Sequence, residues 1–203
     1  MDSTDGGLTV LEAVILGVVA LLLAAVAIHA AAGPAAAPGG LIPLVLGETG
    51  DCLVLDGNVY GYALADGSIG GADLRCDRPD PSAMGSLACS VRLFIGDMGS
   101  IDMGRATVEV ATRERVERLG MTTEMPVLPG NWTIVRKGHT VPFQEADDDL
   151  LLEPGERFDL LVYPSRPLAR GEAFRLCITP PGSVPLVVER TVPPRITPVV
   201  DLG

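Results

Sequence analysis

Basic residues are scarce in this sequence. It contains a single lysine, Lys137, and no lysine or arginine before Arg75, while acidic residues outnumber basic ones by 26 to 15 and give a net charge of −11. Proteins that bind nucleic acid neutralise phosphates with clustered Lys and Arg side chains. The composition therefore excludes nucleic acid as a partner.

The sequence also lacks the common signatures of enzymes. It contains no GxxxxGK[ST] phosphate loop, no HExxH zinc motif and no GxSxG nucleophile turn. Its two histidines are far apart in the chain: we expect His29 at the end of an apolar segment and His139 in a surface loop. We therefore predict a protein that is not an enzyme and needs no cofactor.

Hydrophobic residues are concentrated near the N-terminus. No side chain is polar from Val14 to Ile28, and Gly33-Pro34 is a helix stop signal. A helix over residues 8–32 would be about 37 Å long, more than the roughly 30 Å of a bilayer core, and residues 33–40 would form a linker. Three interpretations fit such a helix: a secretory signal cut near Ala31, a permanent membrane anchor, or a retained helix that packs against copies of itself.

The residues around Gly7 favour the third interpretation. Gly7 precedes Leu8, and Glu12 is the fifth residue counted from Leu8, just before the uninterrupted apolar run. This arrangement resembles the class III signal of type IV pilins and archaeal flagellins (archaellins), which a dedicated peptidase cuts after the glycine. The resemblance implies that residues 1–7 are a leader removed between Gly7 and Leu8.

The same resemblance gives the apolar segment a role in assembly. The Glu12 carboxylate would pair with the new amine of a neighbouring subunit in the filament core, although Glu12 would equally complement the dipole of its own helix. The residues expected to pack in the resulting helix bundle are Glu12, Val14, Ile15, Leu16, Val18, Leu21, Leu22 and Val26.

Residues 41–203 have a β-type pattern. Nine short runs rich in β-forming residues are separated by Gly, Pro, Asp and Ser, and polar and apolar residues alternate in Arg157–Tyr163 and in Phe174–Ile178. Only Arg113–Leu119 looks helical, and a charged turn explains it equally well. The fold class predicted for the whole chain is α+β: a long hydrophobic N-terminal helix followed by a C-terminal antiparallel, immunoglobulin-like β-sandwich. The runs are Cys52–Leu55, Asn58–Tyr62, Ala72–Cys76, Ser90–Ile95, Thr107–Thr112, Asn131–Arg136, Glu156–Tyr163, Ala173–Ile178 and Val184–Arg190.

Four segments resemble successive landmarks of the archaellin head: Asn58–Tyr62, Ser100–Gly104, Leu152–Phe158 and Ile178–Thr191. The resemblance implies a structural subunit of an extracellular archaeal filament, the archaellum, used for swimming. Its implied partners are copies of itself, the class III signal peptidase, the archaellum export and motor machinery, and the membrane before assembly. Two alternatives stay open: an adhesive type IV pilin, and a membrane-anchored accessory or stator protein of the archaellum.

Four cysteines lie in the expected head. Their even number and an external location favour disulfides, and no CxxC pair points to zinc. We expect Cys76 to pair with Cys89, closing a Pro/Gly-rich loop, and Cys52 to pair with Cys177. Buried free thiols are the alternative.

Two further sites follow from local motifs. Asn131-Trp132-Thr133 is a sequon for N-glycosylation, a modification common in archaellins, but Trp132 also looks like a core anchor and Asn131 like a cap of the preceding turn. Asp147, Asp149 and Glu153 offer the oxygen ligands that Ca²⁺ or another divalent cation prefers. The EF-hand glycine is missing, so a solvated acidic loop is the alternative for this stretch.

Overall fold

The strands of this protein follow one another from residue 53 to the C-terminus. The computed structural model describes residues 52–94 and 99–203, which belong to the unit Gly47–Gly203; the predicted leader, residues 1–7, the helix, residues 8–32, and the linker, residues 33–40, lie outside them. The elements are β1 (Leu53–Leu55), β2 (Tyr60–Leu64), β3 (Gly67–Ile69), β4 (Ala72–Leu74), β5 (Asp80–Leu93), β6 (Ile101–Asp102), the 3-10 helix η1 (Met103–Arg105), β7 (Thr107–Thr112), β8 (Val116–Met121), β9 (Asn131–His139), β10 (Leu151–Leu152), β11 (Glu156–Tyr163), β12 (Ala173–Thr179), β13 (Leu186–Thr191) and β14 (Val199–Asp201).

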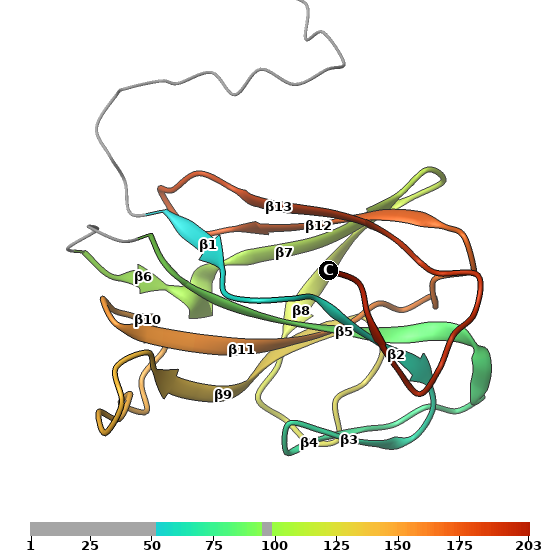
Figure 1. Ribbon diagram of the computed structural model, residues 1–203, viewed down its shortest axis with the longest axis horizontal. Helices are drawn as coiled ribbons and strands as arrows, with labels where there is room; N and C mark the ends of the chain where they lie inside the picture. The colour runs from blue at the N-terminus through green and yellow to red at the C-terminus, as the bar shows by residue number, and fades with distance from the viewer. Residues whose placement is uncertain (1–51, 95–98) are drawn as a thin grey trace, which may run out of the picture. The chain divides into compact units, whose positions relative to one another are not determined.

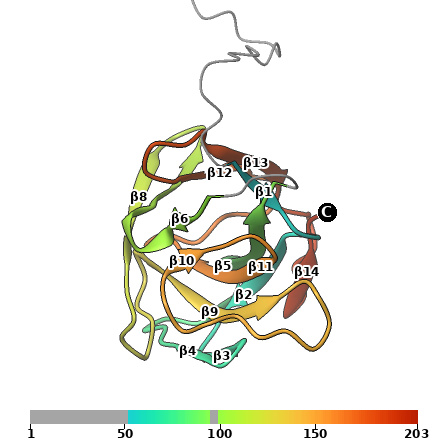
Figure 2. The same cartoon turned by 90° about the vertical axis from the view of Figure 1, so that its left-hand side faces the viewer.

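Ten strands form one curled sheet in the order β13-β12-β7-β8-β9-β11-β5-β2-β14, with β1 paired to β5. Strand β8 joins the two halves of this sheet, because it runs antiparallel to β7 and then parallel to the start of β9. Strands β13, β12 and β7 consequently lie over β5, β11 and β9 (Figures 1 and 2). The hairpin β3-β4 forms a separate two-stranded sheet below the second layer, and β6 pairs with β10.

The main core fills the space between the two layers. In β12, the buried Phe174, Leu176 and Ile178 alternate with exposed or half-buried residues, as expected of a strand with one buried face. Trp132 of β9 and Phe158 of β11 are completely buried in the same cluster. The alternation seen in the sequence therefore identifies the inner face of the sheet correctly.

A second, smaller core lies on the outer side of β11. Leu161 and Tyr163 point away from the main core and pack with Ala72, Leu74 and Val127. The hairpin β3-β4 covers them and is tied to the loop before β9 by backbone hydrogen bonds from Arg75 N to Val127 O (3.2 Å) and from Val127 N to Asp73 O (2.7 Å). The second half of β11, residues 160–163, is thus buried on both faces.

The predicted α+β class is wrong for the part of the chain that the structure describes. That part contains fourteen strands and one three-residue 3-10 helix, but no α-helix. The helical component of the prediction rested on residues 8–32, which lie outside the described residues. None of the helical segments within residues 52–94 and 99–203 is long and apolar enough to cross a membrane.

The strand predictions hold better, with two differences. All nine runs overlap strands, and β7 and β11 have the predicted bounds. Arg113–Leu119 is neither a helix nor only a turn: the chain reverses after Thr112, whose N–H donates to Arg115 O (2.7 Å), and Val116 then begins β8. Strand β5 begins ten residues earlier than its predicted run, at Asp80 instead of Ser90. The pattern of β5 was hidden because its first residues include Pro, Gly and Ser, which are typical of loops.

Candidate functional site

The outer face of β8, β7, β12 and β13 is an open sheet surface. One row of cross-strand neighbours runs over it from Val116 to Ala111, Arg175 and Glu189. The side chains point away from the main core, because the residues that alternate with them are buried. Val116 is 71% exposed and Val187, in the next row, 48%. The described residues therefore leave this face accessible to solvent.

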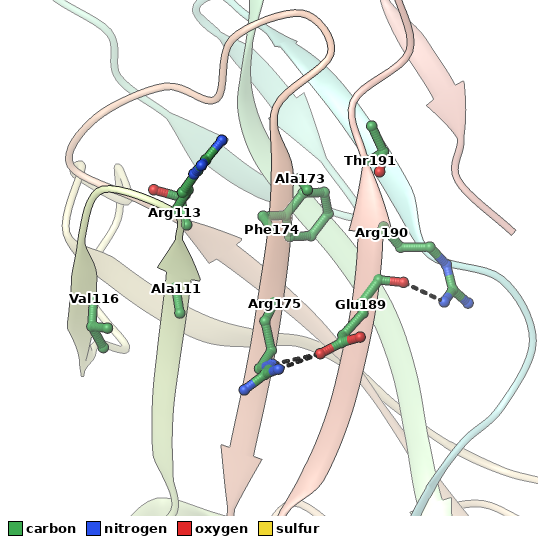
Figure 3. Close-up of a pocket in the computed structure, with 10 residues that line it drawn as sticks. Ala111, Arg113, Val116, Ala173, Phe174, Arg175, Glu189, Arg190 and Thr191 are labelled. Carbon is green, nitrogen blue, oxygen red and sulfur yellow. Dashed lines mark hydrogen bonds and ion pairs between the residues drawn. The ribbon is translucent and has the colours of Figure 1, made fainter. Parts of the chain in front are cut away.

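A groove of about 640 Å³ lies on this face beside the β7-β8 hairpin (Figure 3). Ala111, Val116 and Ala173 give it an apolar part, while Arg113 and Arg190 line its ends. We call these residues, together with Phe174, Arg175, Glu189 and their neighbours Thr112 and Thr191, the hairpin groove. It is open, partly apolar and edged by positive charge.

The arginines of the hairpin groove differ in their partners. Arg175 forms an ion pair with Glu189, with Nε 2.7 Å from Oε1. Arg190 donates to the carbonyl oxygens of Gly203 (2.7 Å) and Glu189 (2.9 Å). Arg113 has no hydrogen bond or ion pair to any described residue. Arg113 is thus the lining charge left for a partner, and it favours an anionic one.

The loop between β9 and β10 lies at the opposite end of the layers from the β7-β8 hairpin (Figure 1). A turn from Val141 to Gln144, closed by a hydrogen bond from Gln144 N to Val141 O (3.3 Å), places Phe143 at its tip. Phe143 is fully exposed and has a φ of 66°. Glu145, Asp147, Asp148 and Asp149 follow it, and all four are exposed. We call residues 141–149 the acidic loop.

A buried carboxylate holds the acidic loop in place. Glu156, 6% exposed, accepts hydrogen bonds from Asp147 N (3.2 Å) and Glu153 N (3.1 Å). The Pro154-Gly155 turn that precedes Glu156 is closed by Glu156 N donating to Glu153 O (3.0 Å), and Gly155 has a φ of 89°. The LEPGE motif is therefore a turn that places the buried Glu156 carboxylate at the base of the acidic loop, where it accepts backbone hydrogen bonds.

The carboxylates predicted to bind a metal are used differently here. Asp147 Oδ1 accepts from Asp149 N (3.0 Å), and Asp149 Oδ1 accepts from Leu151 N (2.7 Å), as in successive Asx turns. Within the described ranges, no group of three or more His, Cys, Asp or Glu side chains is placed to hold a metal. Cation binding by Asp147, Asp149 and Glu153 stays a prediction.

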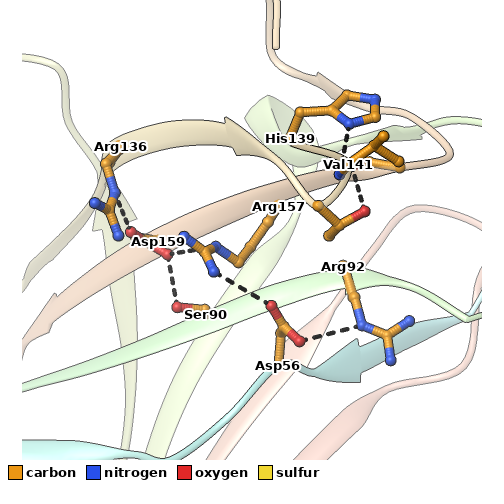
Figure 4. A network of polar contacts seen from close by, with 10 residues as sticks. Asp56, Ser90, Arg92, Arg136, His139, Val141, Arg157 and Asp159 are labelled. Atoms are coloured by element: carbon orange, nitrogen blue, oxygen red, sulfur yellow. Dashed lines mark hydrogen bonds and ion pairs between the residues drawn. The ribbon is translucent and has the colours of Figure 1, made fainter. Parts of the chain in front are cut away.

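An ion-pair network covers the rest of the outer face of β5, β11 and β9 (Figure 4). Arg92 and Arg157 are cross-strand neighbours of like charge. Asp56 bridges them, at 3.3 Å from Arg92 Nε and 3.6 Å from Arg157 Nη1. Asp159 contacts Arg157 (3.4 Å) and Arg136 (2.6 Å) and accepts from the hydroxyl of Ser90 (2.6 Å). The network neutralises charges that would otherwise repel across the strands.

His139 ends β9 next to this network and is not in a loop as predicted. Its Nδ1 accepts from Val141 N (3.0 Å), and its ring packs so closely on Gly155 that a Cβ there would lie 2.7 Å from it. With Asp56, Arg92 and Arg157 it lines a cleft of about 430 Å³. The bond to Val141 gives His139 a structural task at the start of the acidic loop.

The expected disulfides are not formed in this structure. Cys76 and Cys89 are free, buried thiols: Cys89 lies in the main core, whereas Cys76 follows β4 at the second core. Residues 80–93 form a strand instead of the expected closed loop, which separates them. Cys177 is a free thiol in β12, 3.6 Å from Thr179 Oγ1, so it does not pair with Cys52. The alternative of buried free thiols describes Cys76 and Cys89, whereas Cys177 is only half-buried.

The sequon lies at the start of β9. Trp132 and Thr133 are buried, and Asn131 Nδ2 donates to Leu128 O (3.0 Å), which closes the turn before the strand. Trp132 is therefore a core anchor and Asn131 caps the turn, as the second interpretation expected. Glycosylation of Asn131 stays a prediction.

The cleavage and assembly residues Gly7, Leu8, Glu12, Val14, Ile15, Leu16, Val18, Leu21, Leu22 and Val26 lie outside the described residues. The hairpin groove and Phe143 were not foreseen. A signal for Phe143 existed, because Pro142 favours the second position of a turn and leaves Phe143 at the third. No local signal marks the groove, whose residues come from four strands.

Comparison with known proteins was made by sequence and by structure. By sequence, the chain matches no protein-family model and no curated protein. By structure, it is similar to archaeal flagellin FlaB1 of Methanocaldococcus jannaschii, with a TM-score of 0.55 and 15% identity over 75% of this chain and 97% of that one. Weaker likenesses are to the archaeal flagellum of Methanospirillum hungatei (TM-score 0.46, 21% identity, 74% of this chain and 70% of that one) and to the archaellum periplasmic stator protein FlaG of Sulfolobus acidocaldarius (TM-score 0.41, 14% identity, 68% and 98%).

These three likenesses differ in what they establish. TM-scores of 0.46 and 0.41 are too low to carry an argument about this chain. The likeness to FlaB1 concerns the fold and covers almost all of that protein. The resemblance indicated by the sequence is thereby confirmed at the level of the fold, and the described domain has an archaellin-like fold.

Proposed function

We propose that this chain is a structural, non-enzymatic subunit of an archaellum, the extracellular archaeal filament used for swimming. The observation that carries the proposal is the fold of the described domain, which matches an archaeal flagellin over 97% of that protein. The sequence supports it independently, through the class III signal around Gly7 and the ordered landmarks of an archaellin head.

Assembly begins, in this proposal, at the membrane. The class III signal peptidase cuts between Gly7 and Leu8, and the export and motor machinery of the archaellum then adds the subunit to the filament. The apolar segment, residues 8–32, joins the same segments of other copies in the filament core, with Glu12 setting the register. Each fully buried Val, Leu or Ile side chain contributes about 1.5–3 kcal/mol, so this segment supplies the largest favourable term of polymerisation.

The β domain forms the outer surface of the filament in this proposal. Removing Asp2 and Asp5 with the leader changes the net charge from −11 to −9, because −11 + 2 = −9. The charge that remains keeps the filament soluble. Rotation needs energy from another protein, since this chain has no Gly-rich phosphate loop of the Walker type.

The N-terminal sequence of the chain in sheared cell-surface filaments tests the proposal. We expect the mature protein to begin at Leu8. A start near Ala31 would show that the apolar segment is a discarded signal and would overturn the filament model. An intact Met1 recovered only from membranes would overturn it in favour of an anchored accessory protein.

A leader variant sharpens the test. Gly7→Trp should block cleavage, so that cells producing only this variant lack filaments and do not swim. Thr4→Val changes the same leader away from the cut and should leave both intact. Normal filaments from Gly7→Trp would refute the cleavage model. Filaments that form normally in wild-type cells but play no part in swimming would instead identify an adhesive pilin.

A further inference from the structure

The two ends of the β domain carry opposite charges. The acidic loop lies at one end of the long axis and the β7-β8 hairpin, which borders the hairpin groove, at the other (Figure 1). Exposed carboxylates follow an exposed aromatic ring in the loop, and arginines edge an apolar surface in the groove (Figure 3). Both features are accessible among the described residues.

The side chain of Phe143 buries no surface within the described domain. Its side chain is completely exposed, and its φ of 66° falls in the left-handed region that favours glycine at the third position of a turn. A bulky residue in this conformation is strained. Because the ring buries no surface within the described residues, nothing there offsets the strain. A contact with another molecule would.

The carboxylates of the acidic loop form no ion pair with a described residue, although Asp147 and Asp149 accept backbone N–H groups. Asp148, for example, makes no side-chain hydrogen bond or ion pair to a described residue; only its carbonyl oxygen accepts a bond, from Lys137 Nζ. Arg113 in the hairpin groove is equally unpaired. Opposite charges at the two ends favour contact between them.

We propose that the acidic loop of one copy docks into the hairpin groove of the next, with the Phe143 ring on the apolar part and the carboxylates against Arg113. The loop and the groove lie at opposite ends of one domain, so the contact joins two copies. Such a contact uses different patches on its two partners and extends into an open chain. The inference rests on the proposed function for the identity of its partner, a second copy of this chain.

A photo-cross-linker in place of Phe143 tests the contact in the full chain, in intact cells. Phe143→p-benzoylphenylalanine should give a covalent dimer on irradiation, with cross-linked peptides from residues 111–116, 173–175 or 189–191 of the second copy. Leu128→p-benzoylphenylalanine is the control, because Leu128 is an exposed apolar residue (51%) on another loop. Cross-links to residues 1–51 of the same chain, to a different protein, or at no more than the control yield would overturn the proposal.

A charge exchange tests the electrostatic part in the background of the Phe143 cross-linker. Arg113→Glu and Asp148→Arg should each lower the dimer yield several-fold, and combining them should restore most of it. Asp148 is chosen because the Asp147 carboxylate holds the loop together and the Asp148 carboxylate does not. A double variant no better than the single ones would overturn the assigned pairing of the two ends.

These results separate the two proposals. Filaments whose subunits begin at Leu8 but which give no dimer would disprove the docking and leave the filament function standing. A mapped dimer in cells where the chain keeps Met1 and stays in the membrane would support the docking and disprove the filament function.

Discussion

The two outer faces of the sheet are built differently. On the outer side of β11, Leu161 and Tyr163 are buried beneath the hairpin β3-β4, whereas on the outer side of β12, Arg175 is exposed and Cys177 half-buried. In β11 four consecutive residues, 160–163, are buried, while β12 alternates strictly. The difference shows that an apolar run without alternation marks a strand covered on both sides, and that alternation marks a face left for solvent or a partner.

The covered face should contribute far more to stability than the open one. Leu161→Ala leaves a cavity under the hairpin β3-β4 and should lower the free energy of unfolding by about 2–5 kcal/mol. Val116→Ala, its control on the open face, should change it by less than about 0.5 kcal/mol. Chemical unfolding followed by the fluorescence of Trp132, the single tryptophan and fully buried, measures both. Equal costs would mean that the open face is covered as well.

The base of the acidic loop should behave like the covered face although the loop itself is exposed. Glu156→Gln replaces a buried carboxylate that accepts two backbone N–H groups and should lower the free energy of unfolding by about 1–3 kcal/mol. Glu153→Gln changes an exposed neighbour whose side chain has no partner among the described residues, and should be nearly neutral. Faster proteolysis between residues 141 and 149 in Glu156→Gln alone would show that the loop has loosened. Equal proteolysis of both variants would contradict this role.

Thiol chemistry distinguishes the main core from the open face. Burial, and then the charge of Asp159, raise the pKa of Cys89 from 9.0 to about 12. The folded state therefore disfavours the thiolate, so this contribution to stability is complete below pH 9 and is lost as the pH rises towards 12, by at most about 1.4 kcal/mol per pH unit. Cys89→Ala should flatten the decline in stability above pH 9. At pH 8, alkylation should modify Cys177 in the folded protein and Cys89 only after unfolding.

Strand positions were predictable to the extent that each strand carries its own pattern. The bounds of β7 and β11 follow from alternation and from flanking turn residues such as Pro154-Gly155. The first half of β5 was missed because its burial depends on β2 and β11, which the local sequence does not encode. Arg113–Leu119 was misjudged for a similar reason: pairing with β7 outweighs the helical appearance of a charged segment.

The candidate surfaces were less predictable than the strands. The row from Val116 to Glu189 exists only because four strands align in one register, and register is a property of the whole sheet. The predicted pairing of Cys76 with Cys89 assumed a Pro/Gly-rich loop between them, but residues 80–93 form a strand that places Cys89 in the main core. The LEPGE motif indicates a turn, but the sequence does not indicate that the Glu156 carboxylate accepts hydrogen bonds from Asp147 N and Glu153 N.

The ion-pair network on β5 and β11 should matter less than either apolar cluster. Asp56→Asn removes the charge that bridges Arg92 and Arg157, whose side chains are 28% and 35% exposed. Solvent and ions screen such pairs, so we expect a loss of about 0.2–1 kcal/mol at low salt that shrinks in 1 M NaCl. Asp73→Asn, an exposed carboxylate outside the network, is the control. A loss that persists at high salt would show that packing, not charge, is responsible.

The smallest change in stability is expected at Phe143, where a change in assembly should be clear. Phe143→Gly relieves the strain of a positive φ. It should raise the free energy of unfolding by between zero and about 1 kcal/mol. Phe143→Ala removes the same ring but keeps a Cβ in the strained conformation, so it should gain nothing. Both variants should weaken filaments against dissociation by heat, because both lose the ring that docks into the hairpin groove. If either variant instead unfolds more easily than the wild type, the Phe143 ring stabilises its own subunit. The distinction between a covered face for stability and an open face for contact would then fail at this residue.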